Sequence, residues 1–129
     1  MIVIDASALV AILLEEPEAQ TLREFLLLNP GASLSPVGYW EAATRLRTLR
    51  GERGLAELDI VIQSLEVEVA PATAATARLA SAAERAFGKR TPAKLNLGDC
   101  FAYALAKELN APLLYKGDDF ALTDVAPAV

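Results

Sequence analysis

The sequence predicts an α/β fold: a mainly parallel sheet of four to five short strands, flanked by helices. Two observations predict it. Short apolar or β-branched runs alternate with longer helical stretches along the whole chain, an order that builds right-handed βαβ units and therefore parallel strands. Pro, Gly and Asn separate the runs, but no linker, repeat or change of composition divides the chain. We therefore expect residues 1–129 to form a single domain, close to the usual size of about 100–150 residues.

The expected elements follow from local signals. Residues 1–4 are entirely apolar and end at Asp5, which predicts a buried strand. Ser35 as an N-cap and Pro36 at the first helical position mark the start of a long helix, which Gly51 ends. The expected order is strand 1–4, helices 7–14 and 18–28, strand 32–34, helices 36–50 and 55–65, strand 67–70, helices 72–87 and 97–109, strand 112–115 and a short last strand 122–125.

Composition excludes several classes of site. With one Cys and no His, the chain cannot form a disulfide framework, a Cys/His zinc site or a His-dependent catalytic triad. The 12 Lys and Arg against 17 Asp and Glu give a net charge of −5, so binding to nucleic acid needs a local basic patch or bound cations. The apolar content of 53% predicts an interface with a second copy or a partner on helices 7–14, 18–28 or 55–65.

The chain shows no targeting or membrane signal. Residues 1–14 are largely apolar, but they lack a basic start and contain Asp5. No run reaches the roughly 18 apolar residues that span a bilayer. We therefore expect a cytoplasmic protein with no membrane segment.

Acidic residues gather where strands end. Asp5 follows the first strand, Asp118 and Asp119 follow strand 112–115, and Asp99 opens a helix. The carboxyl ends of parallel strands meet at one edge of a sheet, where ligands bind, so we expect these acids to converge there. Each also has a structural interpretation: a helix N-cap for Asp5, a first-turn acid for Asp99, and turn residues for the pair.

Two further acids have weaker local signals. Helix 36–50 presents an apolar face formed by Tyr39, Ala42, Ala43, Leu46 and Leu49. Glu41 lies off this face, four residues before Arg45, and periodicity alone favours an exposed ion pair between the two. Asp124 follows Thr123 and is typical of a turn or a solvated position.

Several carboxylates without histidine indicate a hard divalent metal ion. Mg²⁺ or Mn²⁺ binds oxygen ligands, keeps several waters and is completed by substrate phosphates. Such an ion acidifies a water and neutralises charge at phosphorus, which indicates phosphodiester or phosphoryl chemistry. Two other acidic α/β classes fit less well. A haloacid-dehalogenase-type phosphatase needs a second Asp where Ser7 stands, and a response-regulator receiver needs an Asp after strand 67–70, where Pro71 stands.

Four short motifs occur in one order along the chain. They are Asp5-Ala6-Ser7-Ala8-Leu9, Trp40-Glu41-Ala42-Ala43, the stretch from Leu95 to Ala106, and Lys116-Gly117-Asp118-Asp119-Phe120 followed by Thr123-Asp124. With them the chain resembles the PIN domain family, and more closely the VapC-type toxins of bacterial type II toxin–antitoxin modules. The resemblance covers essentially the whole chain and implies a PIN-like three-layer α/β/α fold and a Mg²⁺-dependent endoribonuclease.

The resemblance also implies roles for individual residues. Asp5, Glu41 and Asp99 match the family's first three acids, so it overturns the periodicity-based interpretation of Glu41. The fourth acid falls on Asp119, with Asp118 as the less favoured choice. The metal ligands implied are Asp5, Asp99 and Asp119, with Mg²⁺ or else Mn²⁺ as the ion. Further candidates for the site are Ser7, Asp118 and Asp124. The implied partners are an RNA substrate, a VapB-type antitoxin and a second copy of the chain.

Two groups of basic residues are candidates for RNA binding. The first group is Lys89, Arg90, Lys94 and Lys116, and the second is Arg45, Arg47, Arg50 and Arg53. A solvated surface explains the first group as well as RNA binding does, and it explains the second group better than RNA binding does. Tyr39, Trp40 and Tyr103 are candidates for stacking on bases, although aromatic residues on helices more often belong to a core. A catalytically inactive PIN-like module that binds RNA or protein remains the alternative function.

Overall fold

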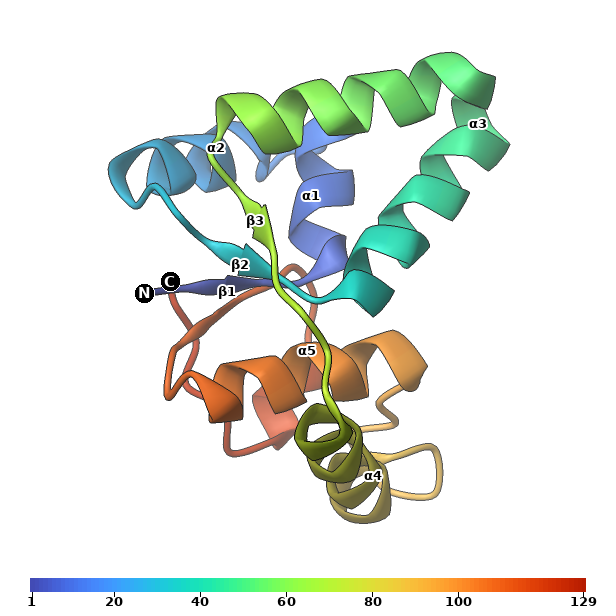
Figure 1. The fold of residues 1–129 in the computed structure, drawn as a ribbon, viewed down its shortest axis with the longest axis vertical. Coiled ribbons are helices and arrows are strands. Elements are labelled where there is room, and N and C mark those ends of the chain that lie inside the picture. The colour runs from blue at the N-terminus through green and yellow to red at the C-terminus, as the bar shows by residue number, and fades with distance from the viewer.

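The sheet has four short parallel strands. The computed structural model describes all residues 1–129. Its strands are β1 (Val3–Ile4), β2 (Ser33–Leu34), β3 (Glu68–Val69) and β4 (Leu113–Leu114). They pair in the order β3-β2-β1-β4, and every pair is parallel. The predicted parallel sheet is therefore confirmed, and the first strand lies in its interior (Figure 1).

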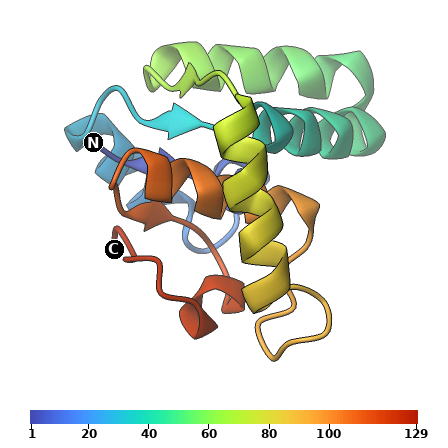
Figure 2. The ribbon, with the colours of Figure 1, turned by 60° about the horizontal axis from the view of Figure 1, so that its bottom comes forward.

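Five helices cover the two faces of this sheet. They are α1 (Ala6–Leu13), α2 (Ala19–Leu28), α3 (Pro36–Ser64), α4 (Ala74–Phe87) and α5 (Leu97–Glu108). Helices α1 to α3 lie on one face and α4 and α5 on the other (Figure 1), and α4 packs across α5 (Figure 2). Successive strand residues point to opposite faces. Ile4 and Leu114 therefore pack against the first group of helices, and Val3 and Leu113 against the second.

Helix α3 turns sharply at Gly51. This glycine has φ 67° and ψ −157°, a backbone conformation that side-chain-bearing residues rarely adopt. The predicted break at this residue is present, but the two helical segments run on as one element. The Tyr39 hydroxyl on the first segment donates to the Asp59 carboxylate on the second at 2.7 Å, which ties the two together.

The prediction of a last strand at residues 122–125 is wrong. Asp119–Leu122 forms a short 3₁₀ helix instead, because Phe120 is buried and pulls the chain inward. The Thr123 hydroxyl donates to the Phe120 carbonyl at 2.7 Å and closes this turn. The chain pairs with β4 only further on: Leu113 N–H donates to the Ala126 carbonyl at 2.8 Å, and Ala128 N–H donates to the Leu113 carbonyl at 2.9 Å.

Exposed apolar side chains are present in two of the three regions where they were expected, and absent from the first. All residues of α1 except Ser7 are buried within the chain, so this helix offers no free apolar face. Exposed apolar side chains do lie in the other two regions: on α2, at Leu27 and Leu28, and on α3, at Ile60 among others. No helix is both long enough and apolar enough to cross a membrane.

Candidate active site

One cavity lies beyond the carboxyl ends of β1 and β4. It encloses about 300 Å³ and is mostly polar. Its lining residues are Asp5, Ala6, Ser7, Val10, Glu16, Glu41, Arg45, Asn96, Asp99, Lys116 and Asp119. The structure thus brings together Asp5, Glu41, Asp99 and Asp119, which are up to 114 residues apart in sequence (119 − 5).

Asp5 enters this cavity directly from the end of β1. Its side chain is the N-cap of α1 and accepts a hydrogen bond from Ser7 N–H at 3.0 Å. The pKa of its carboxyl is raised to about 6, mainly by burial and in smaller part by the charge of Asp99, although hydrogen bonds from Ser7 and Ala6 act to lower it. Asp5 is therefore both the N-cap of α1 and a residue of the cavity, and the two roles are compatible because the cap fixes the direction of the carboxylate.

Asp99 reaches the cavity from the first turn of α5. It forms a capping box with Asn96: Asn96 N–H donates to Asp99 Oδ2 at 3.0 Å, and Asp99 N–H donates to Asn96 Oδ1 at 2.8 Å. Burial raises the pKa of its carboxyl, the hydrogen bond from Asn96 lowers it, and the charge of Asp119 raises it again. The positive charge of Lys89 also lowers this pKa, but the net direction is upward because burial has the largest effect.

Glu41 lies between α3 and α5. It forms no ion pair with Arg45, so the interpretation from periodicity is wrong. Its carboxylate lies against Gly98 in the first turn of α5, and α5 therefore covers a side of α3 that periodicity marks as solvent-facing. The pKa of Glu41 is raised to about 7, mainly because the carboxyl is buried and in smaller part because the charges of Asp5 and Asp99 lie nearby.

Asp118 and Asp119 differ in position. Both are exposed, but only Asp119 lines the cavity. Phe120 holds the turn in place, since it is buried and its ring packs on Tyr115 with the centroids 5.1 Å apart. The geometry therefore favours Asp119 over Asp118 as the fourth acid of the cavity.

Ser7 and Lys116 join the two strand ends that form the cavity. Lys116 N–H donates to Ser7 Oγ at 3.0 Å, which links the start of α1 to the segment after β4. The Lys116 ammonium forms an ion pair with Glu16 and lies 3.8 Å from a carboxylate oxygen of Glu18. Lys116 therefore lines the cavity with its charge already matched by neighbouring carboxylates.

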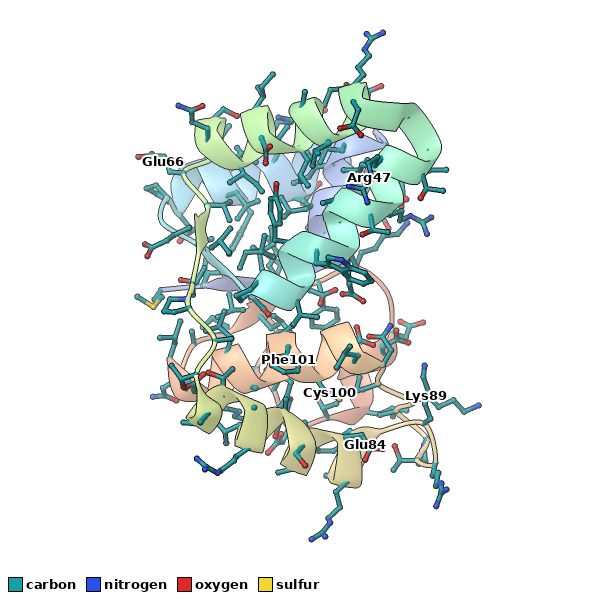
Figure 3. The ribbon with its side chains drawn as sticks, turned by 45° about the vertical axis from the view of Figure 1, so that its right-hand side comes forward. Arg47, Glu66, Glu84, Lys89, Cys100 and Phe101 are labelled. Carbon is teal, nitrogen blue, oxygen red and sulfur yellow. The ribbon has the colours of Figure 1, made fainter.

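The predicted basic groups are only partly at the cavity. Of the first group only Lys116 lines it, since Lys89 lies outside and donates to the Lys94 carbonyl at 3.2 Å. Of the second group only Arg45 lines it, and Arg45 has no ion pair. Figure 3 shows Arg47 and Lys89 at widely separated places, so the two groups do not form one patch.

Asp124 lies away from the cavity. The hydroxyl of Tyr103 donates to its carboxylate at 2.5 Å, and Lys107 lies 3.3 Å from it. These partners lower the pKa of Asp124 and give it a structural role. Tyr103 is buried and so unavailable for stacking on a base, whereas Trp40 is 62% exposed.

The donor set of the cavity suits a hydrated divalent cation. Its acids offer only oxygen ligands, and burial and mutual repulsion raise the pKa of three of them. No three acidic side chains meet closely enough to form a complete protein ligand set. Mg²⁺ does not require one, because it keeps several waters and is held in proteins through one or two carboxylates. The residues present therefore fit Mg²⁺ or Mn²⁺.

Comparison with known proteins identifies the family. The PIN domain family model matches residues 2–126, and the chain belongs to this family. It is 46% identical over 125 residues to "Ribonuclease VapC" of Mycolicibacterium smegmatis, an alignment covering 96% of this chain and 97% of the relative. It is 42% identical over 125 residues to "Ribonuclease VapC30" of Mycobacterium tuberculosis, covering 96% of this chain and 95% of the relative.

Two solved structures share the fold. Mycobacterium tuberculosis VapC20, described as a "Sarcin-Ricin loop cleaving toxin", superposes with a TM-score of 0.80 at 17% identity, covering 98% of this chain and 97% of that chain. VapBC2 from Rickettsia felis, bound to a DNA fragment from its promoter, gives a TM-score of 0.72 at 18% identity, covering 98% and 96%. At these identities the likeness concerns the fold, and it agrees with the three layers seen here.

Proposed function

We propose that this protein is a divalent-metal-dependent endoribonuclease of the VapC type, a toxin that is neutralised by a VapB-type antitoxin. The observation that supports this most strongly is the meeting of Asp5, Glu41, Asp99 and Asp119 in one cavity. Relatives named VapC ribonuclease, at 37–46% identity over nearly the whole chain, support the reaction class. From these ribonuclease relatives, which match the chain over nearly its whole length, we infer that it acts in the cytoplasm.

Different residues of the cavity have different roles in the proposed reaction. Asp5, Asp99 and Asp119 would hold Mg²⁺ or Mn²⁺, which when bound supplies positive charge against the phosphate and acidifies a water. Glu41, whose pKa of about 7 lies near neutral pH, accepts the proton of the attacking water as a general base. The caps of α1 and α5 keep Asp5 and Asp99 in place, and Ser7 holds the segment after β4 against α1.

Arg45 is the residue that best fits a contact with the RNA backbone. It lines the cavity and is not paired with any carboxylate, whereas Lys116 is already paired. A guanidinium binds phosphate oxygens through two parallel hydrogen bonds and keeps its charge at all relevant pH values. Trp40, exposed next to Glu41 on α3, is positioned to stack on a neighbouring base.

The antitoxin and a second copy of the chain are the proposed protein partners. VapBC2 of Rickettsia felis is a toxin–antitoxin pair of the same fold. The acidic cavity attracts a basic segment of an antitoxin, and exposed apolar side chains such as Leu27, Leu28 and Ile60 offer surface for docking or dimerisation.

The proposed activity is tested by incubating a structured RNA with the purified protein. We expect cleavage with Mg²⁺ or Mn²⁺ and none when EDTA is added. RNA binding without cleavage under every metal condition would instead support the inactive binding module. A thermal melt supplies a second readout: Mg²⁺ should raise the Tm of the wild type more than that of Asp5→Asn, and equal gains would contradict a shared metal site.

A further inference from the structure

Gly98, the second residue of α5, is in direct contact with Glu41. A Cβ atom built on Gly98 would meet Oε1, Cδ and Oε2 of Glu41 first, all well inside 3.0 Å, a separation that real Cβ atoms essentially never show. The carboxylate of Glu41 thus occupies the space in which any other residue would carry its side chain. The three atoms nearest to this Cβ all belong to Glu41, so no other residue of the core lies closer.

The backbone of Gly98 does not explain the choice of glycine. Gly98 has helical geometry within α5 and is not among the glycines with positive φ. Glycine is a poor helix former compared with alanine. Glycine at this position therefore reduces helix stability, although the backbone conformation does not require it. What the position needs is the absence of a side chain at a buried contact between α3 and α5.

We infer that Gly98 is a positioning residue, which leaves the space that lets Glu41 reach from α3 into the acidic cavity next to Asp99. Its effect on cleavage rests on the proposed function, whereas the contact itself does not. Asp99 follows Gly98 directly but is held by its capping box with Asn96. A substitution at position 98 therefore displaces Glu41 and leaves Asp99 where it is.

The test variant is Gly98→Ala, which adds one methyl group at this contact. The Glu41 carboxylate is the end of a flexible side chain, so it swings into solvent and the protein stays folded. Cleavage should fall about 100-fold, as expected when a general base is removed. Glu41→Gln should fall by as much, and the double variant Glu41→Gln/Gly98→Ala no further, because both changes remove the same group.

A measurement without RNA or metal tests the contact independently. We expect the Glu41 carboxyl, followed by NMR in metal-free protein, to titrate closer to the ordinary value in Gly98→Ala than in the wild type, because it moves from a buried position into water. Gly38→Ala is the matched control. Gly38 is also a buried first-turn helical glycine, but the atom nearest to its Cβ would be the Leu34 Cδ1 methyl, at 3.0 Å, and the next ones lie at ordinary contact distances. It should change neither readout.

The outcomes separate this inference from the proposed function. Unchanged Glu41 titration, or cleavage by Gly98→Ala at the wild-type rate, overturns the positioning role. If the wild type cleaves no RNA, the proposed function fails, and the titration alone decides whether Gly98 places Glu41. If Gly98→Ala does not fold, Glu41→Ala/Gly98→Ala must fold for the inference to hold, since only the Glu41 clash is then relieved.

Discussion

Helix α5 carries one aspartate in its first turn and contacts another, from the C-terminal segment, through two side chains further along the helix; the two acids have opposite surroundings. At the N-terminal end, Asp99 lies in a cavity with other acids, and its pKa is raised. Towards the C-terminal end, Asp124 accepts a hydrogen bond from Tyr103 and lies 3.3 Å from the Lys107 ammonium, and its pKa is lowered. The same helix therefore carries an acid that is buried at a cost in stability, Asp99, and supplies the partners that stabilise another acid, Asp124.

The difference separates structural from functional carboxylates. An acid with its own cation and hydroxyl partner contributes modestly to the fold and needs no further explanation. Acids gathered without a matching cation reduce stability, and such arrangements occur mainly at functional sites. The predictions below change one acid or one cation at a time to test this distinction.

The largest effect is expected for Asp5→Asn. Asparagine keeps the N-cap of α1 but loses the charge, so RNA cleavage should drop by at least about 100-fold. The same variant should be more stable than the wild type in EDTA at pH 8, because a buried charge has been removed. A variant that is both inactive and less stable would contradict the distinction.

The pH dependence of stability sharpens this prediction. In the folded state the pKa of Asp5 is about 6, above its ordinary value of 3.8, so the folded protein holds more protons than the unfolded chain between these values. Stability in EDTA should therefore fall as the pH rises from 4 to 7, by up to about 3 kcal/mol for this group. Urea unfolding at both pH values measures the fall, which should be smaller in Asp5→Asn.

The next largest effect compares two neighbouring acids. Asp119→Asn should lose most cleavage activity, because Asp119 lines the cavity, and Asp118→Asn should keep a large share of it. Both variants should stay folded, since Asn preserves the turn. Initial cleavage rates of the pair decide the matter, and the reverse order would place the fourth acid on Asp118.

A smaller effect is expected for Arg45→Gln. Removal of one phosphate contact should raise the KM for RNA about tenfold and leave kcat nearly unchanged, with the slope of log K against log salt reduced by about one charge. Arg78→Gln is the control, because Arg78 is exposed on α4 and does not line the cavity. Equal salt slopes for the two variants would show that Arg45 makes no such contact.

The smallest effect is expected at Asp124, the acid that α5 contacts through two of its side chains. Asp124→Asn should lower the free energy of unfolding by less than about 1 kcal/mol, because this acid is largely exposed. Cleavage should remain at the wild-type level. Chemical unfolding measures the first, and a cleavage assay the second; a large loss of cleavage would return Asp124 to the site.

The sequence predicted best those parts of the site that have a local cause. Asp5 and Asp99 were predictable because each follows a strand or opens a helix and also caps it, so neighbouring residues fix its direction. Glu41 was identified only through the family resemblance, because the helix that buries it lies more than 50 residues further along the chain. No pattern in the sequence indicated Gly98, since its reason is a contact rather than a backbone conformation.

The fold shows the same division. The alternation of strands and helices predicted the parallel sheet, and Gly51 predicted a break in the helix, because both follow from local signals; that the two helical segments join at a sharp turn was not predicted. The prediction of a strand at residues 122–125 was wrong, because the burial of Phe120 outweighs the strand pattern of this segment. Arg45 lines the cavity without an ion pair, whereas Lys116 is paired with Glu16; the sequence could not show this difference, because it gives the charges but not which of them are paired.

The pairing of the C-terminal segment with β4 has a consequence for assembly. Residues 126–128 cover the outer backbone of β4, one of the two edges of the sheet. The other edge is β3, a strand of two residues that carries exposed Glu68 and is followed closely by Pro71, which has no N–H to donate. Neither edge therefore offers a favourable backbone for pairing with a further strand. Copies of this protein that associate must therefore meet through helix side chains rather than by extending the sheet.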